Sequence, residues 1–250
     1  MLPPEDLEGG LPVGGQFPTT QWSEIIRIKD DEQREAALDA LCRIYWQPLY
    51  IYLRRDQKTR EDAEDIVQSF LARVSQRGDL EKLDPSRGRL RTFLLTALKH
   101  FVINWKEHQA AQRRGGGAPH LSLDLLEAEN LCAADLADHV RADLAYDRAW
   151  ARTILRTAYA KLQDEYRRAG QESVFATLSR FLDGTEASPG AYENAGQVLS
   201  MKPNTVAVRV LRLRQRLRAY ALAEAAATVG SLADAESELR ELYQVLSAPT

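Results

Sequence analysis

Apolar residues recur at helical spacing along most of this chain, and this periodicity constrains the fold more than any other feature. Steps of four place side chains on one face of an α-helix, whereas a strand needs steps of two. One run keeps to steps of four and consists of Trp150, Ile154, Ala158, Leu162 and Tyr166. Alternation typical of a strand is rare elsewhere in the chain. The sequence therefore predicts an all-α protein.

Two small helical domains are predicted on either side of a glycine-rich break, RRGGGAP, at residues 113–119. The chain has 250 residues, of which 44% are apolar, so it can bury a core. The segment after the break is acidic and weakly patterned, which favours a linker. We expect a flexible leader at 1–16, a first domain at 17–114, a flexible acidic linker at 115–147, a second domain at 148–228 and an acidic tail at 229–250.

The cysteine content and the hydropathy pattern exclude several classes of protein. Cys42 and Cys132 are the only cysteines and have no paired spacing, so we expect neither a disulfide framework nor a cysteine-type zinc site. The N-terminal residues are acidic and rich in glycine and proline, and no later run approaches the length of a membrane span. We therefore expect a soluble, cytoplasmic protein with no membrane partner.

Charge is distributed in blocks along the chain. The net charge is −3, yet residues 86–114 carry +6 and residues 204–218 carry +5. Residues 122–147 carry −6, and residues 221–250 carry −4. Solvated faces of ordinary helices usually mix signs. The two basic blocks are therefore candidates for binding an anionic partner.

The second basic block, NTVAVRVLRLRQRLRAY, is predicted to be a helix. A strand would need apolar residues on alternate positions, and that register breaks at Val210 and Leu211. A helix instead gives one apolar stripe beside an arginine face. The stripe contains Val206, Val210, Leu213 and Leu217, and the neighbouring face contains Arg209, Arg212 and Arg216.

The residues before this helix indicate a helix-turn-helix. AYENAGQVL has helical apolar spacing, residues 200–202 form a brief turn, and Pro203 suits the first turn of the next helix. In this motif the second helix enters the DNA major groove, and arginine binds phosphates or guanine edges with two hydrogen bonds. The alternative interpretation is an amphipathic bundle helix whose arginines are only solvated.

Three further helices are predicted in the first domain. One covers about Arg34 to Leu53, with Pro48 expected to kink or divide it. A second covers 62–74, with Thr59 as its cap and four carboxylates near its start, where the helix dipole favours them. A third covers 89–114 and is basic and aromatic.

Taken in order, these motifs resemble a sigma factor of the sigma-70 family, of the extracytoplasmic-function type. YWQPLYIYLRR, EDAEDIVQSFLARV and LDPSRGRLRTFLLTALKHFVINW resemble its second conserved region. DRAWARTILRTAYAKLQDEYRRAG and the helix-turn-helix with VLRLRQRLR resemble its fourth. The resemblance covers about residues 17–114 and 148–226, and the order and spacing of the motifs carry it.

The resemblance implies a transcription initiation factor without catalytic activity, metal or cofactor. Its partners would be core RNA polymerase, through the clamp and flap of the large subunits, promoter DNA, and an anti-sigma protein that holds it inactive. The matching polymerase-binding residues are Asp62, Asp65, Ile66, Gln68 and Phe70. If the resemblance is set aside, the acids among these residues complement the helix dipole, and the apolar ones form part of a core stripe.

The resemblance also implies two promoter contacts. The −10 element would meet Arg89, Arg91, Phe93, Lys99, His100, Asn104, Trp105, Lys106, Arg113 and Arg114, which can neutralise phosphates and stack on extruded bases. The aromatic members also fit a helix core. The −35 element would meet Thr205, Ala207, Val208, Arg209, Arg212 and Arg216. The chain departs from the family pattern at His100, Asn104, Gly196, Ser200 and Ala207.

Three other classes of function stay open. The chain could be a DNA-binding regulator that uses only its helix-turn-helix, or a helical interaction module. A two-metal enzyme would need carboxylates and histidines in a bundle; Glu61, Asp62, Glu64 and Asp65 crowd together, but no Glu-x-x-His pair occurs. The acidic tail could shield the basic helices, bind a partner, or pack as an extra helix.

Overall fold

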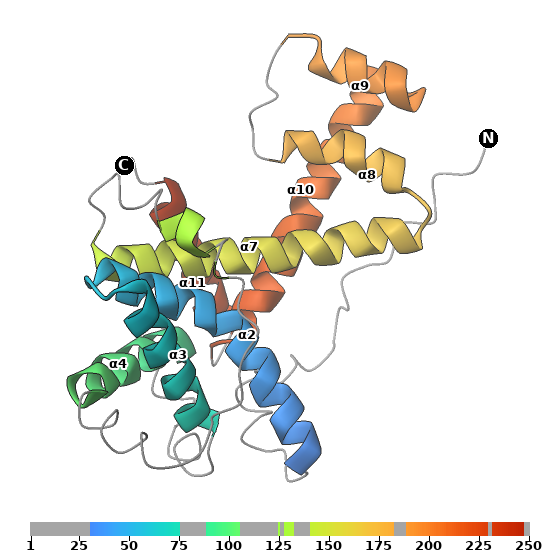
Figure 1. The fold of residues 1–250 in the computed structure, drawn as a ribbon. Helices are drawn as coiled ribbons and strands as arrows, with labels where there is room; N and C mark the ends of the chain where they lie inside the picture. The colour runs from blue at the N-terminus through green and yellow to red at the C-terminus, as the bar shows by residue number, and fades with distance from the viewer. Residues whose placement is uncertain are drawn as a thin grey trace.

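The structure, a computed structural model, describes residues 31–75, 89–105, 125, 128–132, 141–182, 189–229 and 232–247. Every regular element in these ranges is helical, so the all-α prediction is confirmed for the described part of the chain (Figure 1). The predicted leader at 1–16 and the glycine-rich break at 113–119 lie outside the described residues.

Nine helical elements have defined bounds in the described chain, and residues 128–132 are helical as well. The nine are α2 (Asp31–Arg55), α3 (Arg60–Ser75), α4 (Leu90–Ile103), α7 (Ala142–Arg168), α8 (Glu172–Leu178), the 3₁₀ turn η2 (Ser179–Phe181), α9 (Ala191–Leu199), α10 (Pro203–Ala226) and α11 (Leu232–Ser247). Helix α2 continues through Pro48, so the predicted division there does not occur. The predicted cap of α3 is confirmed, because the Asp62 backbone N–H donates to Thr59 Oγ1 over 3.1 Å.

A large hydrophobic core joins α2, α3, α4, the first half of α7, the end of α10 and α11. The Trp150 indole of α7 stacks on the Tyr45 ring of α2, with centroids 4.6 Å apart and planes 14° apart. Leu94 and Leu98 of α4 are completely buried in the same core. The buried face of α4 is therefore held firmly by the larger core.

A smaller core supports the far end of the molecule. It combines α7, α8, η2, α9 and α10, through Leu162, Phe175, Leu178, Phe181, Ala195, Val206, Val210 and Leu213. Helix α7 contributes to both cores, and Figure 1 shows it running from α4 and α11 at one end to α8 at the other. Residues 142–147, predicted as linker, form the first turns of α7.

The described residues of the predicted linker also pack against α2. Ala128 and Cys132 are fully buried. The Glu129 carboxylate accepts hydrogen bonds from Arg54, at 2.7 Å from Nε and 3.1 Å from Nη2, and from the Tyr50 hydroxyl. These contacts fix residues 128–132 against α2, with Ala128 in the larger core.

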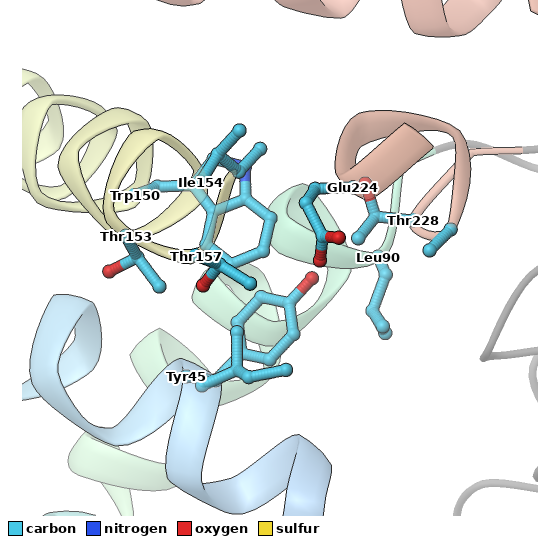
Figure 2. Close-up of a pocket in the computed structure, with 10 residues that line it drawn as sticks. Tyr45, Leu90, Trp150, Thr153, Ile154, Thr157, Glu224 and Thr228 are labelled. Carbon is cyan, nitrogen blue, oxygen red and sulfur yellow. The ribbon is translucent and has the colours of Figure 1, made fainter. Parts of the chain in front are cut away.

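A small cavity lies where α2, α4, α7 and α10 meet (Figure 2). Its volume is about 20 Å³, which is room for about one water molecule. The Tyr45 hydroxyl and the Trp150 Nε1 have no hydrogen-bond partner among the described residues. Figure 2 shows the Tyr45 hydroxyl and the Glu224 carboxylate directed into the same space. This cavity is too small for a cofactor or an organic substrate.

No helix in the described ranges is both long enough and apolar enough to cross a bilayer.

The contact between Glu129 and α2 should make stability depend on pH. Hydrogen bonds from Arg54, and then from Tyr50, hold the pKa of Glu129 below its usual value. A lowered folded-state pKa adds stability above the unfolded glutamate pKa of about 4.3, and this contribution is lost as pH falls through the folded-state pKa. We expect Glu129→Gln to lower the free energy of unfolding by about 1 kcal/mol at neutral pH and by less in acid.

Urea unfolding at neutral and acidic pH measures this difference. A double-mutant cycle with Arg54→Gln isolates the pair, because Arg54 also donates to the Lys58 carbonyl. An equal loss of stability at both pH values would contradict the assignment.

Candidate nucleic-acid interface

The predicted helix-turn-helix is present as α9, residues 200–202 and α10. Ser200 ends α9 in the left-handed conformation, with φ of 53°. The Met201 N–H donates to the Gly196 carbonyl over 2.8 Å, which closes the turn. Pro203 occupies the first turn of α10, as predicted. Together these features fix the direction in which α10 leaves the turn.

Two of the noted departures from the family pattern have a structural account. A β-carbon added at Gly196 would lie 2.6 Å from the Met201 carbonyl oxygen, so the turn has no room for alanine there. Ser200 instead adopts a left-handed conformation that favours glycine. The chain therefore has its glycine at the close approach and a strained serine in the turn.

Helix α10 presents an exposed face beyond this turn. Thr205, Val208 and Arg212 fall at i, i+3 and i+7, so they share one side of the helix, and all three are exposed. Leu211 is 56% exposed beside them. The opposite side carries the predicted stripe: Val206, Val210 and Leu213 are buried in the smaller core, and Leu217 is half-buried against it. Guanidinium, hydroxyl and methyl groups on one helix face suit hydrogen bonds and apolar contacts with base edges.

The remaining predicted −35 residues are less accessible. Ala207 and Arg209 are half-buried. Arg216 Nε donates to both carboxylate oxygens of Glu165 at 3.1 Å, and its guanidinium lies 5.5 Å from the Tyr220 ring centroid. The Tyr220 hydroxyl donates to the same carboxylate over 2.7 Å. Arg216 therefore ties α10 to α7 in this structure.

The basic residues predicted at the −10 site are paired with acids of α7 and α11. Arg91 is only 9% exposed and donates to Glu238 and Asp147. Arg89 donates to Glu241 and forms an ion pair with Glu238. The Lys99 ammonium lies 2.7 Å from Asp143 and 5.4 Å from the Tyr52 ring centroid. Lys106, Arg113 and Arg114 lie outside the described residues.

The carboxylates around Arg89 and Arg91 outnumber the two guanidinium groups. The hydrogen bond from Arg89 lowers the pKa of Glu241. Burial raises the pKa of Asp147, and repulsion from Glu238 adds to this rise although Arg91 opposes it. The positive charges at the start of α4 are therefore matched by carboxylates of neighbouring helices in this structure.

The other predicted −10 residues divide between core and surface. Trp105 is buried and its ring lies 5.8 Å from that of Phe101, and Phe93 is half-buried against the larger core. His100 and Asn104 are exposed at the end of α4, where Ile103 is 77% exposed. The structure thus brings His100 and Asn104 to the surface and places Trp105 among the core residues.

The predicted polymerase-binding residues also divide between core and surface. Asp62 and Asp65 are exposed on α3, and Gln68 is half-buried and donates to Glu64 over 3.4 Å. Ile66 and Phe70 are buried, and the Phe70 ring packs edge-on against Phe101 at 5.7 Å. These two apolar side chains pack α3 onto the larger core, so the acids of α3 are its accessible residues.

Sequence reasoning named the acidic tail as a possible shield of the basic helices but did not identify the acids that pair with α4, namely Asp143, Asp147, Glu238 and Glu241. Glu238 and Glu241 are three residues apart and therefore share a helix face, and both acidic blocks were visible in the sequence. No local sequence pattern indicates which basic residue each acid pairs with. Among the described residues, no group of three or more histidine, cysteine, aspartate or glutamate side chains is placed to hold a metal ion.

Comparison with known proteins gives no relative: no family model, curated protein or solved structure matches the chain.

Opposite effects on stability are expected from Gly196→Ala and Ser200→Gly. The alanine β-carbon would push the Met201 carbonyl away, so we expect a loss of about 1–3 kcal/mol. Glycine at position 200 removes the left-handed strain, and its greater freedom when unfolded offsets part of the gain, so we expect about 0.5–1 kcal/mol of stabilisation. Thermal unfolding of both variants measures these changes, and a stabilising Gly196→Ala would contradict the turn geometry.

Proposed function

We propose that this chain is a transcription initiation factor of the sigma type, which binds core RNA polymerase and directs it to specific promoters. The observation that carries the proposal is the α9–α10 motif with Thr205, Val208 and Arg212 exposed on one face. In a helix-turn-helix these first turns of the second helix meet base edges in the major groove. The helix-turn-helix by itself supports DNA binding. The order and spacing of the sequence motifs add the proposal that the DNA is a promoter.

The proposed role of α10 is to read the −35 element. Arg212 binds a guanine edge or a phosphate, while Val208 and Leu211 contact thymine methyl groups. The smaller core holds α10 by Val206, Val210 and Leu213, so the reading residues project from a rigid element. Arg216 has a supporting role, because it holds α10 against Glu165.

The proposed role of α3 and α4 is to bind polymerase and the melted −10 element. The accessible acids Asp62 and Asp65 support a polar docking face on α3. His100, Asn104 and the exposed Ile103 support a nucleic-acid contact at the end of α4. An anti-sigma protein that covers these faces is part of the same proposal.

A second candidate is a DNA-binding regulator that acts without polymerase. One observation favours it: Arg89, Arg91 and Lys99 are all paired with carboxylates, while the helix-turn-helix face is exposed. Pulldown with purified core RNA polymerase separates the two functions. Retention of the chain by the core enzyme supports the sigma-type function, and its absence favours the regulator.

Reversal of charge at Arg212 should weaken specific promoter binding. We expect Arg212→Glu to weaken binding of the polymerase complex to its promoter by about tenfold or more, because one bidentate base contact is lost. Binding to core polymerase should not change. Gel-shift titration and pulldown of the same preparation measure both quantities.

Two control variants make the same charge change on α10. Arg218 is exposed but six residues further along the helix and on another side, so Arg218→Glu should weaken binding much less. Arg216→Glu should lower thermal stability as well, since it breaks the contact with Glu165. Equal losses for Arg212→Glu and Arg218→Glu would refute the proposed reading face.

A further inference from the structure

The start of α4 and helix α11 form a buried network of ion pairs. Glu238 is completely buried, and its two oxygens accept from Nε and Nη2 of Arg91. Its Oε2 also lies 2.9 Å from Nη1 of Arg89. Glu241 completes the network with both of its oxygens on the Arg89 guanidinium, one of them 2.6 Å from Nη2. Both arginines therefore bind carboxylates through two nitrogens.

This geometry is the one by which arginine binds phosphate. The planar guanidinium presents parallel N–H groups that fit carboxylate and phosphate oxygens alike. Arg89 and Arg91 belong to the basic block of 86–114 whose acid-poor composition suits an anionic ligand. In this structure the carboxylates of α11 occupy those N–H groups of Arg89, and on Arg91 they share them with Asp147 of α7.

Apolar contacts hold α11 in place alongside the ion pairs. Ala235, Leu239 and Leu242 are buried in the larger core, and the Arg148 side chain of α7 donates to the Val245 carbonyl over 3.4 Å. Most buried side chains of that core nevertheless come from α2, α3, α4 and α7. These four helices would therefore keep their contacts with one another if α11 moved away.

We propose that α11 is an intramolecular mask, which blocks the arginines at the start of α4 with carboxylates that stand where nucleic-acid phosphates would bind. This inference rests on the proposed function, since it assumes that α4 binds DNA. Release of α11 removes the carboxylates from Arg89 and takes Glu238 from Arg91, whose Nη1 still donates to Asp147 of α7. The apparent affinity for DNA then depends on the fraction of molecules in which α11 is released.

Stability alone does not explain why this contact is a buried ion-pair network. Paired charges in a core are often no more stabilising than well-packed apolar residues, because both ions lose their hydration. A network of guanidinium and carboxylate groups can, however, exchange one anion for another. The mask explains why arginines rather than apolar residues face α11.

Binding of a fluorescein-labelled single-stranded oligothymidylate to the full chain tests the mask. The variant Glu241→Gln weakens the outer ion pair, and the Glu241 side chain is 45% exposed, so the fold should persist. We expect it to tighten binding by about two- to fivefold. The double variant Glu238→Gln with Glu241→Gln should tighten binding further, by about tenfold or more.

Glu236→Gln is the matched control. Glu236 is exposed on the same helix, and its substitution makes the same change in net charge. Its affinity should stay within about twofold of the wild type. Hydrogen exchange of residues 235–245 gives a second readout: the oligonucleotide should accelerate exchange in α11 as it displaces the helix, while exchange in α7 stays slow.

The outcomes separate the mask from the proposed function. Equal dissociation constants for Glu241→Gln and Glu236→Gln, or bound oligonucleotide with α11 still protected, would overturn the mask and leave the sigma-type function standing. Absence of binding by every variant, with rapid exchange in α11 of the double variant, would overturn both. Tighter binding by Glu241→Gln alone among the single variants supports the mask.

Discussion

The buried contact between Arg91 and Glu238 ties α11 to the start of α4. These residues are 147 positions apart in the chain, and their pairing brings α11 onto α4. Asp147 of α7 meets the same guanidinium, and the Tyr146 hydroxyl donates to the Arg91 carbonyl over 2.9 Å. A buried charge without a partner is strongly destabilising, so Glu238 needs Arg91 as its partner while α11 stays packed in this position.

Helix α7 extends that arrangement to the helix-turn-helix. Its first half packs on α2, where Arg156 donates to Gln47 over 3.0 Å, and its second half supplies Leu162 to the smaller core and Glu165 to Arg216. Lys161 also pairs with Glu224 on α10. The two proposed DNA-binding faces are therefore held by one continuous helix in this structure.

The local elements of this fold could be read from the sequence. The stripe of Val206, Val210 and Leu213, the Thr59 cap and the turn at 200–202 depend on residues close together in the chain, and all were predicted. Helix α2 is continuous through Pro48 although proline usually disturbs helices, because the packing of its neighbours outweighs that local preference.

The candidate site was less predictable because its residues meet through long-range contacts. Arg91 and Lys99 have the same sequence signature whether they face DNA or an acidic helix. Ile66 and Phe70 were assigned to a binding face, yet the same helical spacing places both in the core. Arg216 lies in an arginine block, but Glu165 on α7 determines where its side chain goes. No local pattern distinguishes these cases.

Run-off transcription with purified core RNA polymerase tests the central claim most directly. The template is sheared genomic DNA from the source organism, so that no promoter has to be assumed. The sigma-type function predicts transcripts that appear only when the chain is added and whose start sites share two upstream elements. A complete lack of chain-dependent transcripts, from core polymerase that is active with another initiation factor, would contradict it.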